Sequence, residues 1–219
     1  DKTKSDSLKQ HSLYTYMMVV ILLVIVAGLL YSIKKDRFQD YVESQQVLMS
    51  HSAEDAVQVL QVYIEQTRRL VSLFTAAESD LINRLAAEPD NEDLIGLLQQ
   101  KLTEHIPDHF AFTLTDEDGE VLLDDFDGKV GEVCLADIRS FEQDEHAHEI
   151  FIHPNPLQYH FDMMTNITLD DGGRGIFFVS FKPDVIATHL ANNEVHGHRL
   201  LLLHSHNEGM IEITADGAR

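Results

Sequence analysis

SLYTYMMVVILLVIVAGLLYSI, residues 12–33, contains no Asp, Glu, Lys, Arg or His. At a rise of about 1.5 Å per residue, a helix of this length covers a membrane hydrocarbon core of about 30 Å. A cleaved signal peptide has a shorter apolar region, of about 7–15 residues, followed by a small-residue cleavage site. Here residues 17–30 are all apolar or Gly. The sequence therefore predicts an uncleaved membrane-spanning helix.

Charge is distributed unevenly on the two sides of this helix. The 219-residue chain has a net charge of −21, yet residues 38–219 hold 10 basic and 34 acidic side chains. Such an acidic domain repels phosphate backbones, so we expect no nucleic-acid partner. Basic residues flank both ends of the span, so the positive-inside rule does not fix its orientation. The short basic tail, residues 1–11, favours a cytoplasmic N-terminus and a domain outside the membrane.

Residues 34–88 are predicted to continue the span as one long stalk helix. No Gly or Pro occurs in residues 31–87, and apolar residues recur at alternating steps of four and three. Nine of twelve positions in this seam are apolar; the others are Gln45, Ser52 and Gln66. The stripe forms either a parallel coiled coil between two copies or a contact with the chain's own domain. Because of the polar positions, we expect a helix that does both.

Residues 89–219 are predicted to form one domain. In it, segments whose apolar residues have helical spacing alternate with segments whose apolar residues have strand spacing. The expected elements are a helix at 91–105, a hairpin at 110–123, a short helix at 135–141, strands at 149–153, 158–169 and 175–182, a helix at 183–191, and a hairpin of 199–204 with 210–214. This order predicts an α+β fold with an antiparallel sheet and flanking helices. The chain does not begin with Met, and we expect a fragment truncated at its C-terminus.

Two motifs in this domain resemble a known family. FTLTDEDGEVLLDDFDGKVG (residues 112–131) and IFFVSF (residues 176–181) follow a membrane helix and a stalk. Over about residues 38–190 the chain resembles the extracytoplasmic Cache or PAS-like sensor domains. Its end, residues 198–219, is similar to the end of such input domains in bacterial GGDEF/EAL proteins, which make or degrade cyclic di-GMP. No GGDEF or EAL catalytic residue is present, and the chain lacks the Trp of the amino-acid-binding Cache class.

The resemblance implies a bacterial inner-membrane protein with a single span in this chain and a periplasmic sensor domain. From the apolar seam we expect a homodimer joined through the stalk helix. A small ligand bound by the domain would control a cytoplasmic output, which is cyclic di-GMP synthesis or hydrolysis by the same resemblance. The alternative is a membrane-tethered dimerisation or interaction module that binds no small ligand.

One face of the predicted sheet is expected to line a ligand pocket. The apolar candidates are Phe112, Phe161, Met163 and Phe177, with Val179 and the helix at 135–141 beside them. Arg174, in a glycine-rich turn, offers a contact for an anion. The alternative interpretation is that the apolar residues are simply the hydrophobic core.

Histidine is abundant and suggests a metal or pH function. The chain has 13 His, six of them in H-x-H pairs, which place two imidazoles on one face of an extended segment. The pairs are His146 and His148, His196 and His198, and His204 and His206. Such pairs can chelate Zn, Ni or Cu. Alternatively, protonation of imidazoles among many carboxylates makes the domain responsive to pH, or the histidines are merely solvated.

No catalytic residues are predicted. The single Cys134 excludes an internal disulfide and has no basic neighbour that would activate its thiol. The sequence contains no G-x-S-x-G, P-loop or dinucleotide-binding glycine pattern, and its acidic turns do not match an EF-hand loop. We therefore expect this chain to have no enzymatic activity of its own.

Overall fold

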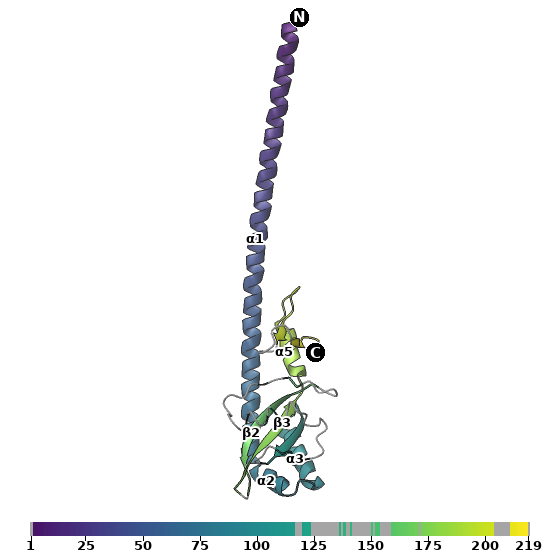
Figure 1. The fold of residues 1–219 in the computed structure, drawn as a ribbon. Helices are drawn as coiled ribbons and strands as arrows, with labels where there is room; N and C mark the ends of the chain where they lie inside the picture. The colour runs from purple at the N-terminus through teal and green to yellow at the C-terminus, as the bar shows by residue number, and fades with distance from the viewer. Residues whose placement is uncertain are drawn as a thin grey trace. The chain divides into compact units, whose positions relative to one another are not determined.

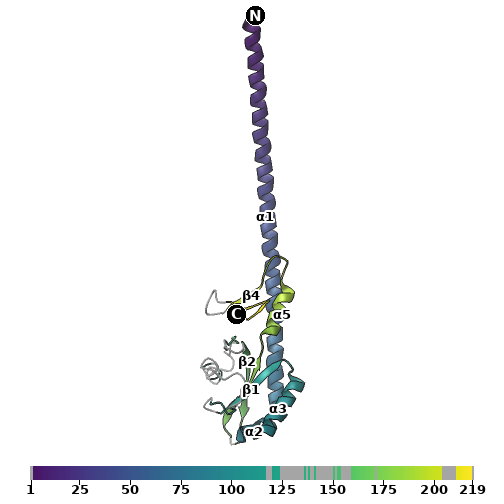
Figure 2. The same ribbon diagram turned by 90° about the vertical axis from the view of Figure 1, so that its right-hand side faces the viewer.

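The structure is a computed structural model that describes residues 2–116, 120–123, 136, 138, 141, 150, 152–153, 159–170, 172–203 and 211–218. The chain divides into two compact units, Asp1–His51 and Ser52–Arg219. The first unit is helical throughout its described residues, and the second combines helices with two small sheets (Figures 1 and 2).

Helix α1 (Lys2–Ala77) contains the predicted span and most of the predicted stalk. Within the described residues it is the one helix long and apolar enough to cross a membrane. Large apolar side chains from Tyr16 to Ile33 are exposed, as expected for a helix whose surroundings are lipid. By length and composition, the prediction of one apolar helix near the N-terminus is confirmed.

The stalk helix ends earlier than the sequence predicted. Instead of continuing to residue 88, α1 ends at Ala77, and α2 (Ser79–Ala87) begins after Glu78. Glu78 has φ −107° and ψ 20°, and its carboxylate accepts a hydrogen bond of 2.8 Å from Lys101 of α3 (Glu92–His105). The break lets α2 turn its apolar side chains into the core shared with α3. No Gly or Pro marks the break, and apolar residues on both sides of it pack in one core with α3.

The central sheet has three antiparallel strands in the order β1-β3-β2. These strands are β1 (His109–Thr115), β2 (Phe161–Thr168) and β3 (Arg174–Phe181). Their periodicity predicted them, and Thr115 pairs with Val121 as expected for the hairpin at 110–123. In the predicted strand at 149–153, His153 forms an isolated bridge with His160. In the predicted short helix at 135–141, the three described residues are helical.

Helix α5 (Asp184–Asn193) and a second small sheet complete the described fold. The sheet consists of β4 (Leu201–Leu203), β5 (Ile211–Thr214) and β6 (Gly217–Ala218) in sequence order. The first two strands form the predicted final hairpin, whereas β6 was not predicted. Mixed helix and antiparallel sheet confirm the α+β class.

The two faces of the central sheet bury different sets of residues, because side chains alternate along each strand. One face shares its core with α1, α2 and α3; Phe74 of α1 stacks on Phe177 with ring centroids 6.1 Å apart. The other face carries a smaller apolar cluster, formed by Ala111, Ile138, Phe141, Met164, Ile176 and Phe178. We call the face that packs on α1, α2 and α3 the helix-side face. We call the opposite face the polar face, because it also carries buried polar side chains.

Tyr63 on α1 makes the stability of the fold depend on pH in the alkaline range. Its ring lies 5.6 Å from that of His189 on α5. Burial raises the pKa of Tyr63, the negative charge of Asp108 raises it further, and a hydrogen bond with the Thr67 side chain lowers it. The folded protein therefore holds the phenol proton more tightly than the unfolded chain does.

We expect Tyr63→Phe to flatten the fall of the melting temperature with pH above about pH 10, the pKa of an unperturbed tyrosine. The raised pKa contributes stability that is fully present below that pH and is lost as the pH rises through the folded pKa. Melting curves at successive alkaline pH values measure the effect. Tyr41→Phe, at an exposed position of the same helix, is the control. Equal slopes for the parent and Tyr63→Phe would contradict the prediction.

Candidate functional site

The polar face of the central sheet buries side chains that do not belong to an ordinary core. Thr113, Thr115 and Ser180 are not exposed to solvent at all, and Asp162 is 2% exposed. Ser180 on β3 lies directly opposite Asp162 on β2, so the two share this face. Burying a hydroxyl or a carboxylate costs free energy unless the group is paired. Their concentration on one face therefore marks a candidate site.

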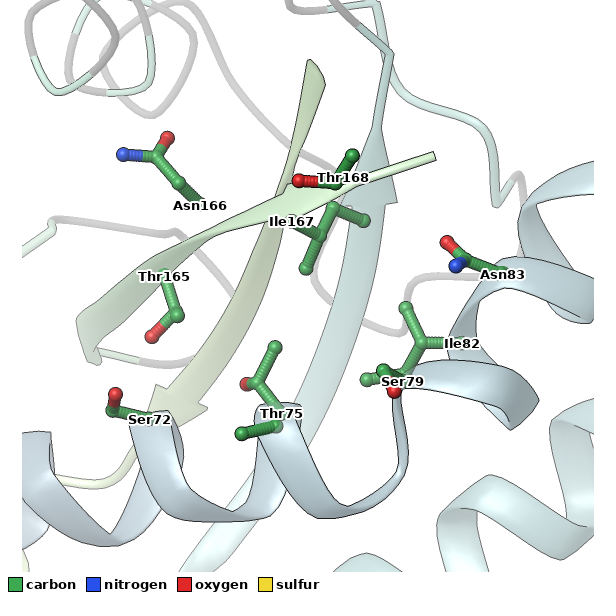
Figure 3. A pocket seen from close by; sticks show the side chains of 10 residues that line it. Ser72, Thr75, Ser79, Ile82, Asn83, Thr165, Asn166, Ile167 and Thr168 are labelled. Atoms are coloured by element: carbon green, nitrogen blue, oxygen red, sulfur yellow. The ribbon is translucent and has the colours of Figure 1, made fainter. Parts of the chain in front are cut away.

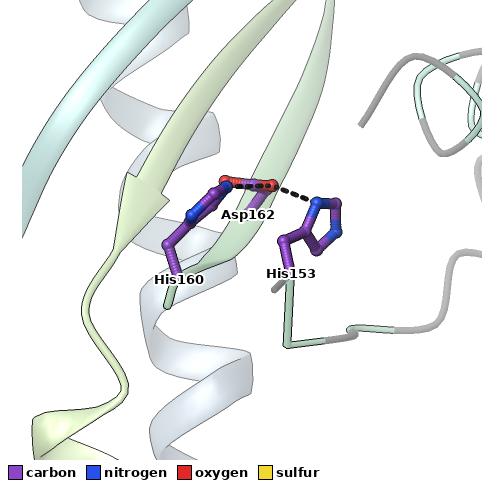
Figure 4. A group of neighbouring side chains, drawn as sticks. All are labelled: His153, His160 and Asp162. Atoms are coloured by element: carbon purple, nitrogen blue, oxygen red, sulfur yellow. Dashed lines mark ion pairs between the residues drawn. The ribbon is translucent and has the colours of Figure 1, made fainter. Parts of the chain in front are cut away.

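Asp162 is the centre of a buried cluster with two histidines (Figure 4). Its Oδ2 lies 3.4 Å from Nδ1 of His153 and 3.7 Å from Nε2 of His160. Its Oδ1 accepts a hydrogen bond of 2.5 Å from the Ser180 hydroxyl. The side chains of the two histidines are 3% and 1% exposed, and that of Asp162 is inaccessible. We call His153, His160 and Asp162 the His–His–Asp cluster.

Strand geometry and one backbone bridge assemble this cluster. His160 and Asp162 are two residues apart, so an extended chain places both side chains on the same face. His153 is brought alongside by hydrogen bonds between backbones: its N–H donates to the carbonyl of His160 at 2.7 Å, and the reverse bond is 3.4 Å. The two imidazole rings lie 5.2 Å apart. Phe110 of β1 meets His160 edge-on, with 5.7 Å between ring centroids.

The cluster offers two nitrogen donors and one oxygen donor that lie within 4.8 Å of one another. Such a set can hold a metal ion, or it can share a proton between the carboxylate and an imidazole. Both arrangements satisfy the requirement that a buried carboxylate be compensated.

Of the three predicted histidine pairs, the structure describes only His196 and His198. His196 and His198 follow α5 in a turn, the first exposed and the second half-buried. His146, His148, His204 and His206 lie outside the described residues. The residues of the His–His–Asp cluster were not selected from the sequence. The available signal was His160-x-Asp162, two polar residues on one face of a strand predicted at 158–169.

The predicted pocket residues lie on the helix-side face. Phe112, Phe161, Met163 and Phe177 are 0–8% exposed and pack in the core that includes Phe74 of α1. Val179 lies in the same core. This is the placement expected under the alternative interpretation that these residues are core. Arg174 is exposed at the start of β3.

An open groove of about 510 Å³ lies between β2 and the junction of α1 with α2 (Figure 3). Ser72 and Thr75 of α1 lie on one side of it, and Thr165 and Ile167 of β2 point toward them. The described residues that line it are neutral, and most offer a hydroxyl or an amide. The groove therefore lacks the charged groups that give the His–His–Asp cluster its chemistry.

Comparison with known proteins identifies no family for this chain. No protein-family model matches the chain, and no curated protein matches it in sequence. The functional interpretation therefore rests on the residues described above, and the resemblance to Cache or PAS-like sensors stays a proposal.

Proposed function

We propose that the chain is the sensory input part of a single-pass membrane signalling protein, with a Cache or PAS-like domain outside the membrane. The observation that supports this is the contrast between the two faces of the central sheet. The helix-side face packs on α1, the helix that also contains the apolar span. The polar face holds buried groups that can bind a ligand.

The central strand β3 connects these two faces. On the polar face, Ser180 contacts Asp162. On the other face, Phe177 of the same strand stacks on Phe74 of α1, with ring centroids 6.1 Å apart. The ring centroid of Phe177 also lies 6.2 Å from that of Phe112. A ligand that binds one arrangement of the strands more tightly shifts the population toward it. Closely packed rings pass such a shift to α1 as a small displacement or rotation.

In this proposal α1 carries the signal to a cytoplasmic output. By resemblance, that output is cyclic di-GMP synthesis or hydrolysis, the membrane is the bacterial inner membrane, and the sensor domain is periplasmic. The chain itself performs no catalysis in this scheme.

The same helix has a surface suited to a second copy of the chain. Val59, Val62, Leu70 and Leu73 are 37–58% exposed. At 3.6 residues per turn, these four and Gln66 form one exposed stripe on α1, beside the face that buries Val71 and Phe74. We call this set of five residues the outer stripe. Two copies tethered by membrane helices meet at high effective concentration, so the outer stripe supports a homodimer.

Disulfide crosslinking in membrane vesicles tests both the dimer and the relay. In a Cys134→Ser background, Gln66→Cys places a thiol in the outer stripe, and Gln61→Cys places one on an exposed position of another side of α1. We expect crosslinking at Gln66→Cys to be about tenfold faster than at Gln61→Cys. Equal rates at the two positions would contradict the dimer.

The relay predicts that the crosslinking rate at Gln66→Cys responds to the polar face. Added amino acids, dicarboxylates and Zn²⁺ are tested in turn, together with Asp162→Asn. At least one of these changes is expected to alter the rate by about twofold or more, since a population shift changes how often the thiols meet. A rate indifferent to all of them would contradict the sensory function. That result would favour the tethered dimerisation module, for which the outer stripe is sufficient.

A further inference from the structure

We infer that the ligand of the polar face is a divalent transition-metal ion, held by His153, His160 and Asp162. Metal binding itself follows from the geometry of the His–His–Asp cluster, whereas its role as a signal rests on the function proposed above.

The donor atoms have nearly the spacing that a metal ion requires. Bonds from zinc to imidazole nitrogen or carboxylate oxygen are about 2.0–2.2 Å, which places neighbouring ligand atoms about 3.0–3.5 Å apart. Oδ2 of Asp162 lies 3.4 Å from Nδ1 of His153 and 3.7 Å from Nε2 of His160. Small side-chain rotations would therefore seat an ion. The backbone bridge between the two histidines preorganises them for it.

The donor types select the class of metal. Ca²⁺ and Mg²⁺ prefer oxygen ligands, whereas imidazole suits Zn²⁺, Fe²⁺, Ni²⁺ and Cu²⁺. Two imidazoles and one carboxylate supply three ligands and leave at least one coordination position open to water or another small molecule. The cluster is thus suited to a first-row transition metal.

Charge and outer-shell contacts agree with this occupant. In the metal-binding state both imidazoles are neutral and Asp162 is ionised, so the three ligands carry one negative charge on side chains that are at most 3% exposed. A dication offsets that charge where water cannot. The Ser180 hydroxyl, bonded to Oδ1, orients the carboxylate so that Oδ2 faces the imidazoles. Metal-binding carboxylates are held by partners of this kind.

The test uses the full 219-residue chain in detergent, stripped with a chelator and titrated with Co²⁺ as the spectroscopic probe. We expect one equivalent of Co²⁺ to bind with visible d–d absorption and to be displaced by Zn²⁺. Asp162→Asn and His160→Gln are expected to weaken binding by about a hundredfold or more, and Ser180→Ala, which keeps all three ligands, by about tenfold.

Control variants separate this cluster from the other histidines. His105→Gln changes an exposed histidine of α3, and a fourfold variant replaces His146, His148, His204 and His206 by Ala. Both are expected to bind Co²⁺ as the parent does. Circular dichroism shows whether each variant is folded. If the ligand variants do not fold, X-ray absorption of the zinc-loaded parent tests the site instead. The cluster predicts that the bound zinc has two imidazole ligands and one carboxylate ligand.

The outcomes separate the metal site from the sensory function. Two results would overturn the metal site: a parent chain that binds no Co²⁺, or Co²⁺ binding that is lost in the fourfold variant but kept in Asp162→Asn. Either result would favour a proton shared within the cluster. The sensory function then still stands if another compound alters crosslinking at Gln66→Cys. Metal bound by the cluster, without any response of that crosslinking rate to Zn²⁺ or other compounds, confirms the site and contradicts the sensory function.

Discussion

Phe177→Ala is expected to lower the free energy of unfolding of the second unit by about 3–5 kcal/mol, the range for truncating a buried phenylalanine. Phe177 is fully buried, stacked on Phe74 of α1 and in contact with Phe112 of β1. Its removal leaves a cavity between the central strand and α1. The backbone on both sides is fixed by helix and sheet hydrogen bonds, so the cavity cannot close by collapse.

Urea titration of the chain in detergent measures this loss. Hydrogen exchange of β3 amides is the readout, so that the apolar span does not contribute to the signal. Leu97→Ala is the matched control, because Leu97 is 41% exposed on α3 and is expected to change stability by no more than about 0.5 kcal/mol. A loss at Phe177→Ala as small as at Leu97→Ala would show that the central sheet does not rely on α1 for its core.

Gly175→Ala is expected to destabilise the second unit by about 1–3 kcal/mol, although alanine is usually the better residue in ordered structure. A Cβ at Gly175 would collide with the backbone carbonyl oxygen of Thr115 and lie 3.3 Å from Cγ1 of Ile167. A carbonyl oxygen cannot rotate aside as a side chain can. The strands must separate where the Ile176 N–H donates to the Thr115 hydroxyl at 3.2 Å.

Gly96→Ala makes the same substitution where space is open. Gly96 lies within α3, and a Cβ there would meet no atom within 4 Å. Replacing a helical glycine by alanine is expected to raise stability by about 0.5–1 kcal/mol. The two substitutions should therefore shift the urea midpoint in opposite directions. Shifts of the same sign would mean that β1 and β3 are not held as closely as the structure shows.

Local patterns in the sequence predicted most helices and strands of this fold. The sequence predicted β2 and β3 as strands at 158–169 and 175–182, and α3 as a helix that begins at Asn91. In the structure its side chain accepts a hydrogen bond from the Leu94 N–H at 3.2 Å. The break at Glu78 had no Gly or Pro as a local signal, and the contacts made there are distant in sequence: Glu78 pairs with Lys101, more than twenty residues away, and α2 packs in the core shared with α3.

The candidate site was harder to predict for the same reason. His160 and Asp162 share a strand face, which the sequence could reveal, but His153 reaches them only through a bridge between separate extended segments. The H-x-H pairs were a stronger local pattern, yet His196 and His198 do not join a described cluster. Apolar alternation likewise identified the buried residues of the sheet without telling which face meets α1.

The inaccessibility of the His–His–Asp cluster has a kinetic meaning. With at most 3% of each side chain exposed, an ion held there would leave only when the surrounding structure opens locally. Its residence time would follow the frequency of those openings, however fast ions diffuse outside. A sensor of this construction would respond to sustained changes in metal availability and not to pulses shorter than that residence time.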